Sequence, residues 1–432
     1  MNLFRLSVSY MRQRTLATLL NVVVLALGVA TIVVLLIVST QVRDNLSRNS
    51  TGIDLVVGAK GSPLQLILSA VYHIDAPAGN IPIDEAQRVM NDRGVELAIP
   101  MALGDSYEGF RLVGSTLDYP AHYEATPAEG RFWEAEEEAT IGARVAAQTG
   151  LAVGDTFESL HGLSGEGEEH ENAPIEVVGI LAETGTVMDQ LILTSIETIW
   201  HVHGIEGHEH AAEAAEHDAG HEGHDAENAP AAESSRTSRP GPGGPRSPEA
   251  PEPEYTALLI QYSSPMAAAA FPRWVNTETD LQAAAPAYET ARLFNLLGVG
   301  FDALRIFGMV LVLAALLSVF VALINALKER RYDLAMMRSL GASRTRLMAH
   351  VLLEGQLLAG MGALLGLAVG HAAAVMLASA FEESRGMAID GSTFVPGEGM
   401  VVLLILGAGL VASLIPAIQA YRTDISSVLA DT

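Results

Sequence analysis

Seven histidines fall within 24 consecutive residues of the sequence, interleaved with glutamate and aspartate. These histidines are His201, His203, His208, His210, His217, His221 and His224. Imidazole nitrogens are good ligands for Zn²⁺, Cu²⁺ and Ni²⁺, and carboxylates can fill the remaining coordination positions. The cluster therefore predicts an exchangeable divalent-metal site, with Zn²⁺ as the first candidate. The alternative is a solvated acidic loop in which histidine has accumulated without a role.

The composition around these histidines is that of an insert rather than of a packed domain. Residues 230–253 are rich in Pro, Gly, Ser and Arg, so we expect a disordered insert at about 200–253. The chain has no cysteine, which excludes disulfides and thiolate metal sites. We find neither a pairing of nucleophile and base nor a Gly-x-x-x-x-Gly-Lys-Ser/Thr motif. We therefore expect that the chain is not an enzyme and does not itself hydrolyse ATP.

Charge is distributed unevenly along the 432 residues. Residues 44–300 contain 12 Lys and Arg against 41 Asp and Glu, whereas the rest of the chain is slightly basic and strongly apolar. Such a division indicates two environments, an aqueous domain and a membrane. The net charge of −26 also argues against nucleic acid as a partner, because a negative field repels phosphate.

Four apolar segments are long enough to cross a bilayer as helices. We expect transmembrane spans at residues 16–40, 306–327, 351–381 and 400–420. A signal peptide is the alternative for the first segment, but its uncharged run exceeds the usual apolar region of about 7–15 residues. The spans leave a short N-terminal stretch, a large domain, two loops and a tail, at 1–15, 41–305, 328–350, 382–399 and 421–432. For the N-terminal stretch we expect a short interfacial helix, with a plain basic flank as the alternative.

Basic residues in the short loops predict the orientation of the spans. Three arginines precede the first span, six Lys and Arg residues lie in the 328–350 loop, and Arg422 follows the last span. The 382–399 loop instead carries four acidic residues and a single arginine. Both termini and the 328–350 loop are therefore predicted to be cytoplasmic, and the 41–305 domain to lie on the opposite side of the membrane.

The third predicted span carries Gly362, Gly366 and Gly370, a spacing of four that places the three glycines on one helical face. Small residues at this spacing let two transmembrane helices approach closely, so we predict a helix-packing face. His371 lies beside these glycines. A histidine within a span is a functional candidate by default, but we expect this one to be neutral and hydrogen-bonded to a neighbouring helix.

The loop after the second predicted span reads Lys328-Glu-Arg-Arg-Tyr-Asp-Leu-Ala-Met-Met-Arg-Ser-Leu-Gly-Ala-Ser343. Gly341 can end one helix and Ser343 can cap the next, which predicts a basic helix–turn–helix. The stretch resembles the Glu-Arg-Arg/Lys-x-Glu-Ile-x-x-Leu-Arg-Ala-Leu-Gly-Ala-Ser/Thr pattern of the FtsX/MacB-type permeases of ABC transporters. Asp333 stands where that family has Glu, and Ser339 where it commonly has Ala.

The C-terminal stretch Pro416-Ala-Ile-Gln-Ala-Tyr-Arg-Thr-Asp424 is similar to the ending of the same family, although Ile425 replaces the usual proline. The resemblance implies a permease homodimer, or a pseudo-dimer of two permeases, that binds cytoplasmic ABC ATPase subunits, with ATP and Mg²⁺ held by those subunits. It also implies a bacterial inner-membrane location with the large domain in the periplasm. The residues expected to couple to the ATPase are Glu329, Arg330, Arg331, Asp333, Arg338, Leu340, Gly341, Ala342 and Ser343.

The large domain reads as an α+β unit. Short apolar runs bounded by glycine and helical stretches occur at 52–61, 139–157, 175–181, 189–194, 255–262 and 266–290. This succession is similar to the periplasmic core domain of MacB-like permeases. The expected fold class is therefore a membrane α-helical protein with one helix before and three helices after a large extracytoplasmic α+β domain.

The resemblance implies a permease that carries ATP-driven motion to the periplasmic domain. The histidines suggest a role in zinc homeostasis, with a periplasmic metal-binding or substrate protein as partner. One alternative is an exporter, or a regulator of lipoprotein release or of a cell-wall hydrolase, without any role for metal. Another is a membrane-anchored metal sensor without an ATPase. A secondary transporter is disfavoured, because the spans show no inverted repeat of broken helices.

Overall fold

The computed structural model describes residues 3–161, 174–203, 253–329, 336–383 and 390–422. The chain divides into two compact units. Residues 1–46 and 292–432 form a helical unit, and residues 47–291 form a sheet unit. Each unit has its own hydrophobic core.

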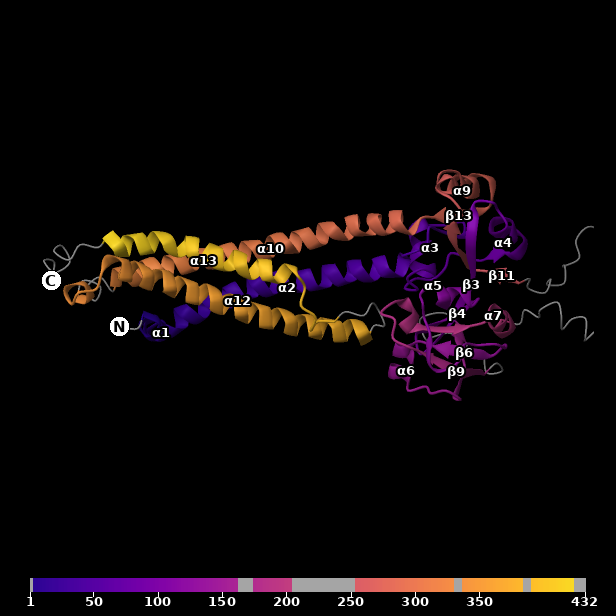
Figure 1. The fold of residues 1–432 in the computed structure, drawn as a ribbon, viewed down its shortest axis with the longest axis horizontal. Helices are drawn as coiled ribbons and strands as arrows, with labels where there is room; N and C mark the ends of the chain where they lie inside the picture. Colours follow the sequence, from indigo (N-terminus) through magenta and orange to yellow (C-terminus); the bar gives the residue numbers. More distant parts are fainter. Residues whose placement is uncertain (1–2, 162–173, 204–252, 330–335, 384–389, 423–432) are drawn as a thin grey trace, which may run out of the picture. The chain divides into compact units, whose positions relative to one another are not determined.

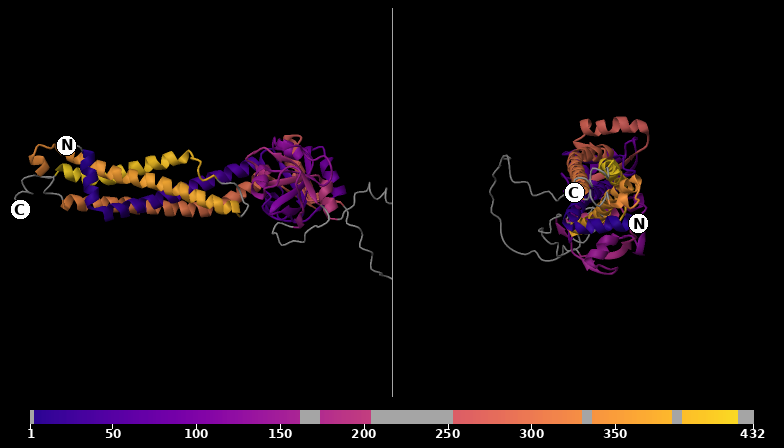
Figure 2. Two further views of the ribbon diagram at one scale, coloured as in Figure 1. Left: turned by 90° about the horizontal axis from the view of Figure 1, so that it is seen from below. Right: turned by 90° about the vertical axis from the view of Figure 1, so that its left-hand side faces the viewer.

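Within the described residues, the helical unit contains the short helix α1 and four long helices that run side by side (Figures 1 and 2). The helices are α1 (Leu3–Gln13), α2 (Thr15–Ser50), α10 (Pro286–Glu329), α12 (Arg344–Glu383) and α13 (Gly397–Arg422). Among the described residues, the four long helices are long and apolar enough to cross a membrane. Each predicted span lies inside one of them. α2 extends past the predicted end of its span, to Ser50, and α10 begins well before the predicted start of its span, at Pro286.

The interior of the helical unit is centred on one face of α2. Leu25, Val29, Val33 and Ile37 repeat every fourth residue and are fully buried. Alanines of α10 and α12 pack against them. Leucines on the outward faces of the same helices remain exposed, for example Leu313, which is 68% exposed. An apolar outer surface of this kind is what contact with lipid requires.

The glycine face of α12 is in contact with this buried face of α2. A Cβ atom at Gly366 would lie 2.5 Å from Val29 Cβ and 2.9 Å from the Ala26 carbonyl oxygen. Gly362 lies in the same way against Leu25, and Gly370 against Val33. The two backbones therefore approach too closely for any side chain at these three positions, as the spacing of the glycines predicts.

The sheet unit contains, within the described residues, an 11-stranded mixed sheet and a two-stranded ribbon. Along the main path the strand order is β13-β1-β12-β3-β4-β10-β6-β9-β5; β7 pairs with β9, β8 with β3, and β11 with β2. The first strands are β1 (Leu55–Ala59), β2 (Ile81–Pro82), β3 (Val95–Tyr107), β4 (Phe110–Ser115), β5 (Pro127–Gly130), β6 (Glu138–Ile141) and β7 (Thr156–Phe157). The remaining strands are β8 (Leu160–His161), β9 (Ile175–Leu181), β10 (Leu191–Thr194), β11 (Glu254–Tyr255), β12 (Ala257–Tyr262) and β13 (Leu281–Ala284).

Short helices cover the sheet over two separate cores. They are α3 (Pro63–Ala70), α4 (Ile83–Met90), α5 (Asp118–His122), α6 (Ala143–Thr149), α7 (Ile196–Val202), α9 (Pro265–Glu278) and the 3₁₀ turn η1 (Val187–Gln190). One core joins α4 and α9 to strands β1, β12 and β13, and the other joins α6 and α7 to strands β4, β6, β9 and β10. The predicted run at 139–157 spans most of β6, α6 and β7, and the runs at 175–181, 189–194 and 255–262 contain β9, β10 and β12, so the predicted α+β domain is confirmed.

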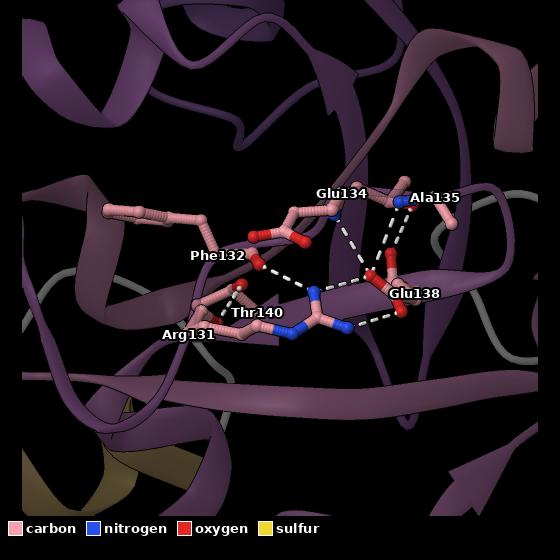
Figure 3. Close-up of polar contacts among 7 residues, drawn as sticks. Arg131, Phe132, Glu134, Ala135, Glu138 and Thr140 are labelled. Carbon is pink, nitrogen blue, oxygen red and sulfur yellow. Dashed lines mark hydrogen bonds and ion pairs between the residues drawn. The ribbon is translucent and has the colours of Figure 1, made fainter.

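The segment between β5 and β6 is held by an ion pair between Arg131 and Glu138 (Figure 3). Arg131 donates from both Nη atoms to the two carboxylate oxygens of Glu138, at 2.7 and 2.6 Å. The backbone N–H groups of Glu134 and Ala135 also donate to Glu138. These bonds, above all those from Arg131, lower the pKa of Glu138 to about 2. The carboxylate therefore stays ionised and keeps the acidic segment in one conformation.

Candidate functional site

The described part of the predicted helix–turn–helix is a tight turn that ends one helix and starts another. Gly341 has a φ of +98°, in the left-handed region that favours glycine. Its N–H donates to the Arg338 carbonyl at 2.9 Å, and the Ala342 N–H donates to the Met337 carbonyl at 3.0 Å. These two bonds form a Schellman motif, which satisfies carbonyls at the end of a helix. The prediction that Gly341 ends a helix is confirmed.

The next helix begins immediately after this turn. Ser343 Oγ accepts a hydrogen bond from the Arg346 N–H at 3.3 Å, and α12 starts at Arg344. Ser343 is therefore an N-cap, as the sequence predicted. With both helix ends capped by neighbouring residues, the turn is fixed by local interactions alone.

The tip of the turn presents an apolar side chain surrounded by positive charge. Leu340 is 83% exposed. Arg344 and Arg346 are exposed just beyond it, and Arg338 is half-buried just before it. The turn therefore presents one exposed apolar side chain among arginines, on a backbone whose two helix ends are both capped. Of the other predicted coupling residues, Arg330, Arg331 and Asp333 lie outside the described residues.

Glu329 is the last residue of α10, and it forms an ion pair with Arg14, which precedes the start of α2. The Glu329 side chain is 66% exposed, so solvent screens the pair and its stabilisation is below about 1 kcal/mol. The contact nevertheless places the end of α10 beside the start of α2. This pair joins the ends of α2 and α10, and Ser343 caps the start of α12.

The short helix α1 packs against the start of α12, which sequence reasoning did not predict. Ser7 Oγ and His350 Nδ1 are 2.9 Å apart, and both residues are buried. The ring of Tyr10 lies 5.7 Å from the His350 ring. Ser7, Tyr10 and Met11 share one face of a helix, which is the only signal in the sequence that α1 has a protein partner. α1 therefore contacts the first turns of the helix that follows the turn at 340–343.

The predicted hydrogen bond between His371 and a neighbouring helix is present. Its Nε2 lies 3.0 Å from Glu398 Oε2 in the first turn of α13, and its Nδ1 lies 2.8 Å from the Gly391 carbonyl oxygen. Glu398 is 3% exposed and also accepts from the Val395 N–H at 3.0 Å. Both ring nitrogens of His371 are thus engaged in joining α12 to the start of α13.

Two of the seven clustered histidines fall within the described residues of the sheet unit. His201 lies on α7, and its Nδ1 is 3.3 Å from Glu137 Oε1. His203 follows the end of α7, and its Nε2 is 3.1 Å from Oδ1 of Asp105, a residue that is 1% exposed. His208, His210, His217, His221 and His224 lie outside the described residues. Among the residues that the structure does describe, no three His, Asp or Glu side chains are grouped as a metal site would require.

The contact with Asp105 has a consequence for the pH dependence of stability. Hydrogen bonding to Asp105 raises the pKa of His203, an effect that outweighs the opposing effect of partial burial. A histidine whose pKa is higher in the folded state stabilises the fold below its unfolded pKa of about 6.5. This stabilisation is lost as the pH rises through the folded pKa.

We therefore expect the His203→Gln substitution to lower the free energy of unfolding of the sheet unit by about 1–2 kcal/mol at pH 5.5 or so, and by less at about pH 8.5. The measurement is denaturant unfolding followed by tryptophan fluorescence, because all three tryptophans of the chain lie in the sheet unit. His201→Gln is the control, because the pair of His201 with Glu137 is exposed and screened by solvent. An equal effect of His203→Gln at both pH values would contradict the assignment.

Comparisons with known proteins match both parts of the chain. Residues 305–425 match the FtsX-like permease C-terminal family, and residues 18–217 match the MacB-like periplasmic core domain family. The first match includes the apolar part of α10, the turn at 340–343, α12 and α13; the second includes α2 and much of the sheet unit. No curated protein sequence matches the chain.

Solved structures with some similarity include the periplasmic region of MacB from Actinobacillus actinomycetemcomitans, with a TM-score of 0.33 and 9% sequence identity. That alignment covers 58% of this chain and 97% of the other chain. The extracellular domain of the noncanonic ABC-type transporter YknZ from Gram-positive bacteria aligns with a TM-score of 0.29 and 14% identity, over 54% of this chain and 98% of the other. The two family matches, found on a chain with four apolar helices and a mixed-sheet domain, show that the chain belongs to the FtsX/MacB-type permeases of ABC transporters.

Proposed function

We propose that this chain transmits the ATP-driven motion of a cytoplasmic ATPase to the sheet unit in the periplasm. The observation that carries the proposal is the capped turn with Leu340 at its tip, because it holds an apolar side chain, exposed within the described part of the chain, on a backbone fixed by two helix caps. The turn continues directly into α12, and α12 contacts α2 along the whole glycine face. A push on the turn is therefore passed to two membrane helices at once.

The proposed orientation puts the turn and both termini in the cytoplasm of a bacterium, with the protein in the inner membrane. It rests on the six Lys and Arg residues of the 328–350 loop and on the acidic character of residues 44–300. We further propose that two copies of the permease assemble with the ATPase subunits, which bind ATP and Mg²⁺. The chain contributes no Walker A motif to this assembly.

The experiment that tests the proposal is purification of the full chain from its own membranes in mild detergent. An ABC ATPase subunit should co-purify with it, and a cysteine introduced at Leu340 should react only with a membrane-permeant thiol reagent in intact cells. The chain has no native cysteine, so the label reports that position alone. Labelling of Leu340→Cys by an impermeant reagent, or the absence of any ATPase, would show instead a membrane-anchored sensor or another kind of protein.

We propose in addition that the assembly serves divalent-metal homeostasis, with zinc bound by the histidines of the insert. The support is the density of ligands in the sequence, seven histidines in 24 residues with interleaved carboxylates. His203 is the histidine least suited to the role, because its Nε2 is engaged by buried Asp105. The five histidines from His208 to His224 are the ligands that we propose. An exporter, or a regulator of lipoprotein release or of a cell-wall hydrolase, needs none of them.

Deletion of residues 204–228 is expected to remove zinc binding from the full chain. This deletion leaves α7 and the contact between His203 and Asp105 in place, and it removes five histidines. The matched control is a deletion of residues 230–250, which shortens the same insert without removing a histidine. Isothermal titration with Zn²⁺ should show binding in the wild type and in the control, weakening below about pH 6 as imidazoles protonate. Unchanged affinity after the 204–228 deletion would remove the metal role and favour the metal-free alternatives.

A further inference from the structure

One buried tyrosine is hydrogen-bonded to two helices that enter the sheet unit. α2 ends at Ser50 and α10 begins at Pro286, so the last residues of α2 and the first turn of α10 belong to the sheet unit. Tyr72 follows α3 and is 6% exposed. Its hydroxyl lies 2.6 Å from Thr290 Oγ1 in α10, and it is also hydrogen-bonded to the side chain of Ser50. A single side chain therefore bridges the end of α2 and the start of α10.

The end of α2 has further anchors that do not involve α10. The Asn49 side chain accepts from the Val187 N–H at 2.9 Å, and the Asn49 carbonyl accepts from the Tyr123 hydroxyl at 2.7 Å. His122 Nε2 donates to the Thr51 carbonyl at 3.0 Å. These contacts attach α2 to η1 and to the segment around α5. Because these contacts hold α2 but not α10, a substitution that removes one of them is a control for a substitution of Tyr72.

The chemistry of the bridge depends on a protonated hydroxyl. Burial raises the pKa of Tyr72, so its hydroxyl remains a donor at physiological pH. Thr290 is 8% exposed, so its hydroxyl has little access to water as a substitute partner. The Tyr72→Phe substitution would keep the ring and its packing but would remove the hydroxyl that bonds to both Ser50 and Thr290. The buried hydroxyl of Thr290 would then lack this partner.

We propose that Tyr72 is a positioning residue that locks the end of α2 and the start of α10 to the sheet unit, so that the two helices move this domain as one rigid body. This inference rests on the proposed function, because a rigid joint matters only if motion passes through it. Without the joint, a displacement of one helix would be absorbed locally by slippage at the helix end.

The first test measures how firmly Tyr72 holds the two helix ends in the absence of nucleotide. The method is amide hydrogen exchange of the full chain in detergent. Tyr72→Phe should accelerate exchange about fivefold at both residues 47–51 and residues 287–291, since one buried hydrogen bond is lost at each end. Tyr123→Phe is the matched control and should accelerate exchange only at residues 47–51. Acceleration at one end only, or at neither end, in Tyr72→Phe would overturn the proposal.

The second test separates the joint from the proposed function as a whole. Cysteines at Leu117 in the sheet unit and at Met400 in α13, both exposed, can carry spin labels because the chain has no other cysteine. In the purified complex with the ATPase, ATP should change the distance between the labels in the wild type, and Tyr72→Phe should reduce this change by half or more while ATP hydrolysis continues. No change in the wild type would refute the proposed function, whereas an equal change in both proteins would refute only the role of Tyr72.

Discussion

Substitution of Leu340 by aspartate is expected to release the ATPase from the permease without unfolding the permease. Leu340 is 83% exposed, so the change removes little packing within the chain. In the complex, an apolar side chain at the centre of a contact is replaced by a carboxylate that has to be desolvated. Losses of this type at a central contact residue cost about 2 kcal/mol or more, which corresponds to an affinity roughly 30-fold lower or weaker still.

The measurement is the amount of ATPase that co-purifies with each variant, followed by titration of the isolated subunits. Leu117→Asp is the matched control, since Leu117 is a half-exposed leucine in the sheet unit, far along the sequence from the turn. It should leave co-purification unchanged. If Leu340→Asp retained the ATPase at the wild-type level, the turn at 340–343 would not be the contact surface, and the proposed route of force into α12 would be wrong.

Substitution of Gly366 by alanine is expected to destabilise the helical unit, although alanine is the better helix former. The added Cβ would lie 2.5 Å from Val29 Cβ, whose branched side chain has little freedom, and 2.9 Å from a backbone oxygen of α2. Overpacking of this kind costs about 1–3 kcal/mol, and α2 and α12 must separate to accommodate it. The midpoint of thermal unfolding should fall by about 3–10 °C.

Gly360 provides a control on the same helix with the same substitution. A Cβ at Gly360 would meet its nearest neighbour, Leu406 Cδ2, at 3.9 Å, which is an ordinary contact distance. Gly360→Ala should therefore leave the unfolding midpoint unchanged or raise it, because alanine favours the helix by about 1 kcal/mol. Equal behaviour of the two variants in detergent unfolding would show that α12 does not pack on α2 through its glycine face.

Local patterns in the sequence were sufficient for the elements and for much of the candidate site. The four spans follow from uninterrupted apolar runs, because a helix in lipid has to be apolar along its whole length. Gly341 and Ser343 act as helix caps through bonds to residues within five positions, so the turn is determined by its own sequence. The glycines of α12 share a face because a helix repeats every 3.6 residues.

Contacts between distant segments could not be predicted in the same way. Nothing local indicates that Ser7 meets His350, 343 positions away, or that Tyr72 meets Thr290. The sequence also gives no local sign that His203 contacts Asp105. This hydrogen bond to a buried carboxylate competes with the metal role that the spacing of the histidines predicts for His203.

The sequence by itself determined that this chain is a four-span membrane protein with a capped basic turn and a glycine-lined helix face, since these properties depend on residues close together in the chain. Only the tertiary structure decided which faces meet: α12 against α2, α1 against the start of α12, and Tyr72 against both helix ends. The physical reason is that an apolar or small-residue pattern specifies a surface to be buried but not the partner that covers it, and the partner is chosen by shape and hydrogen-bond complementarity between distant segments.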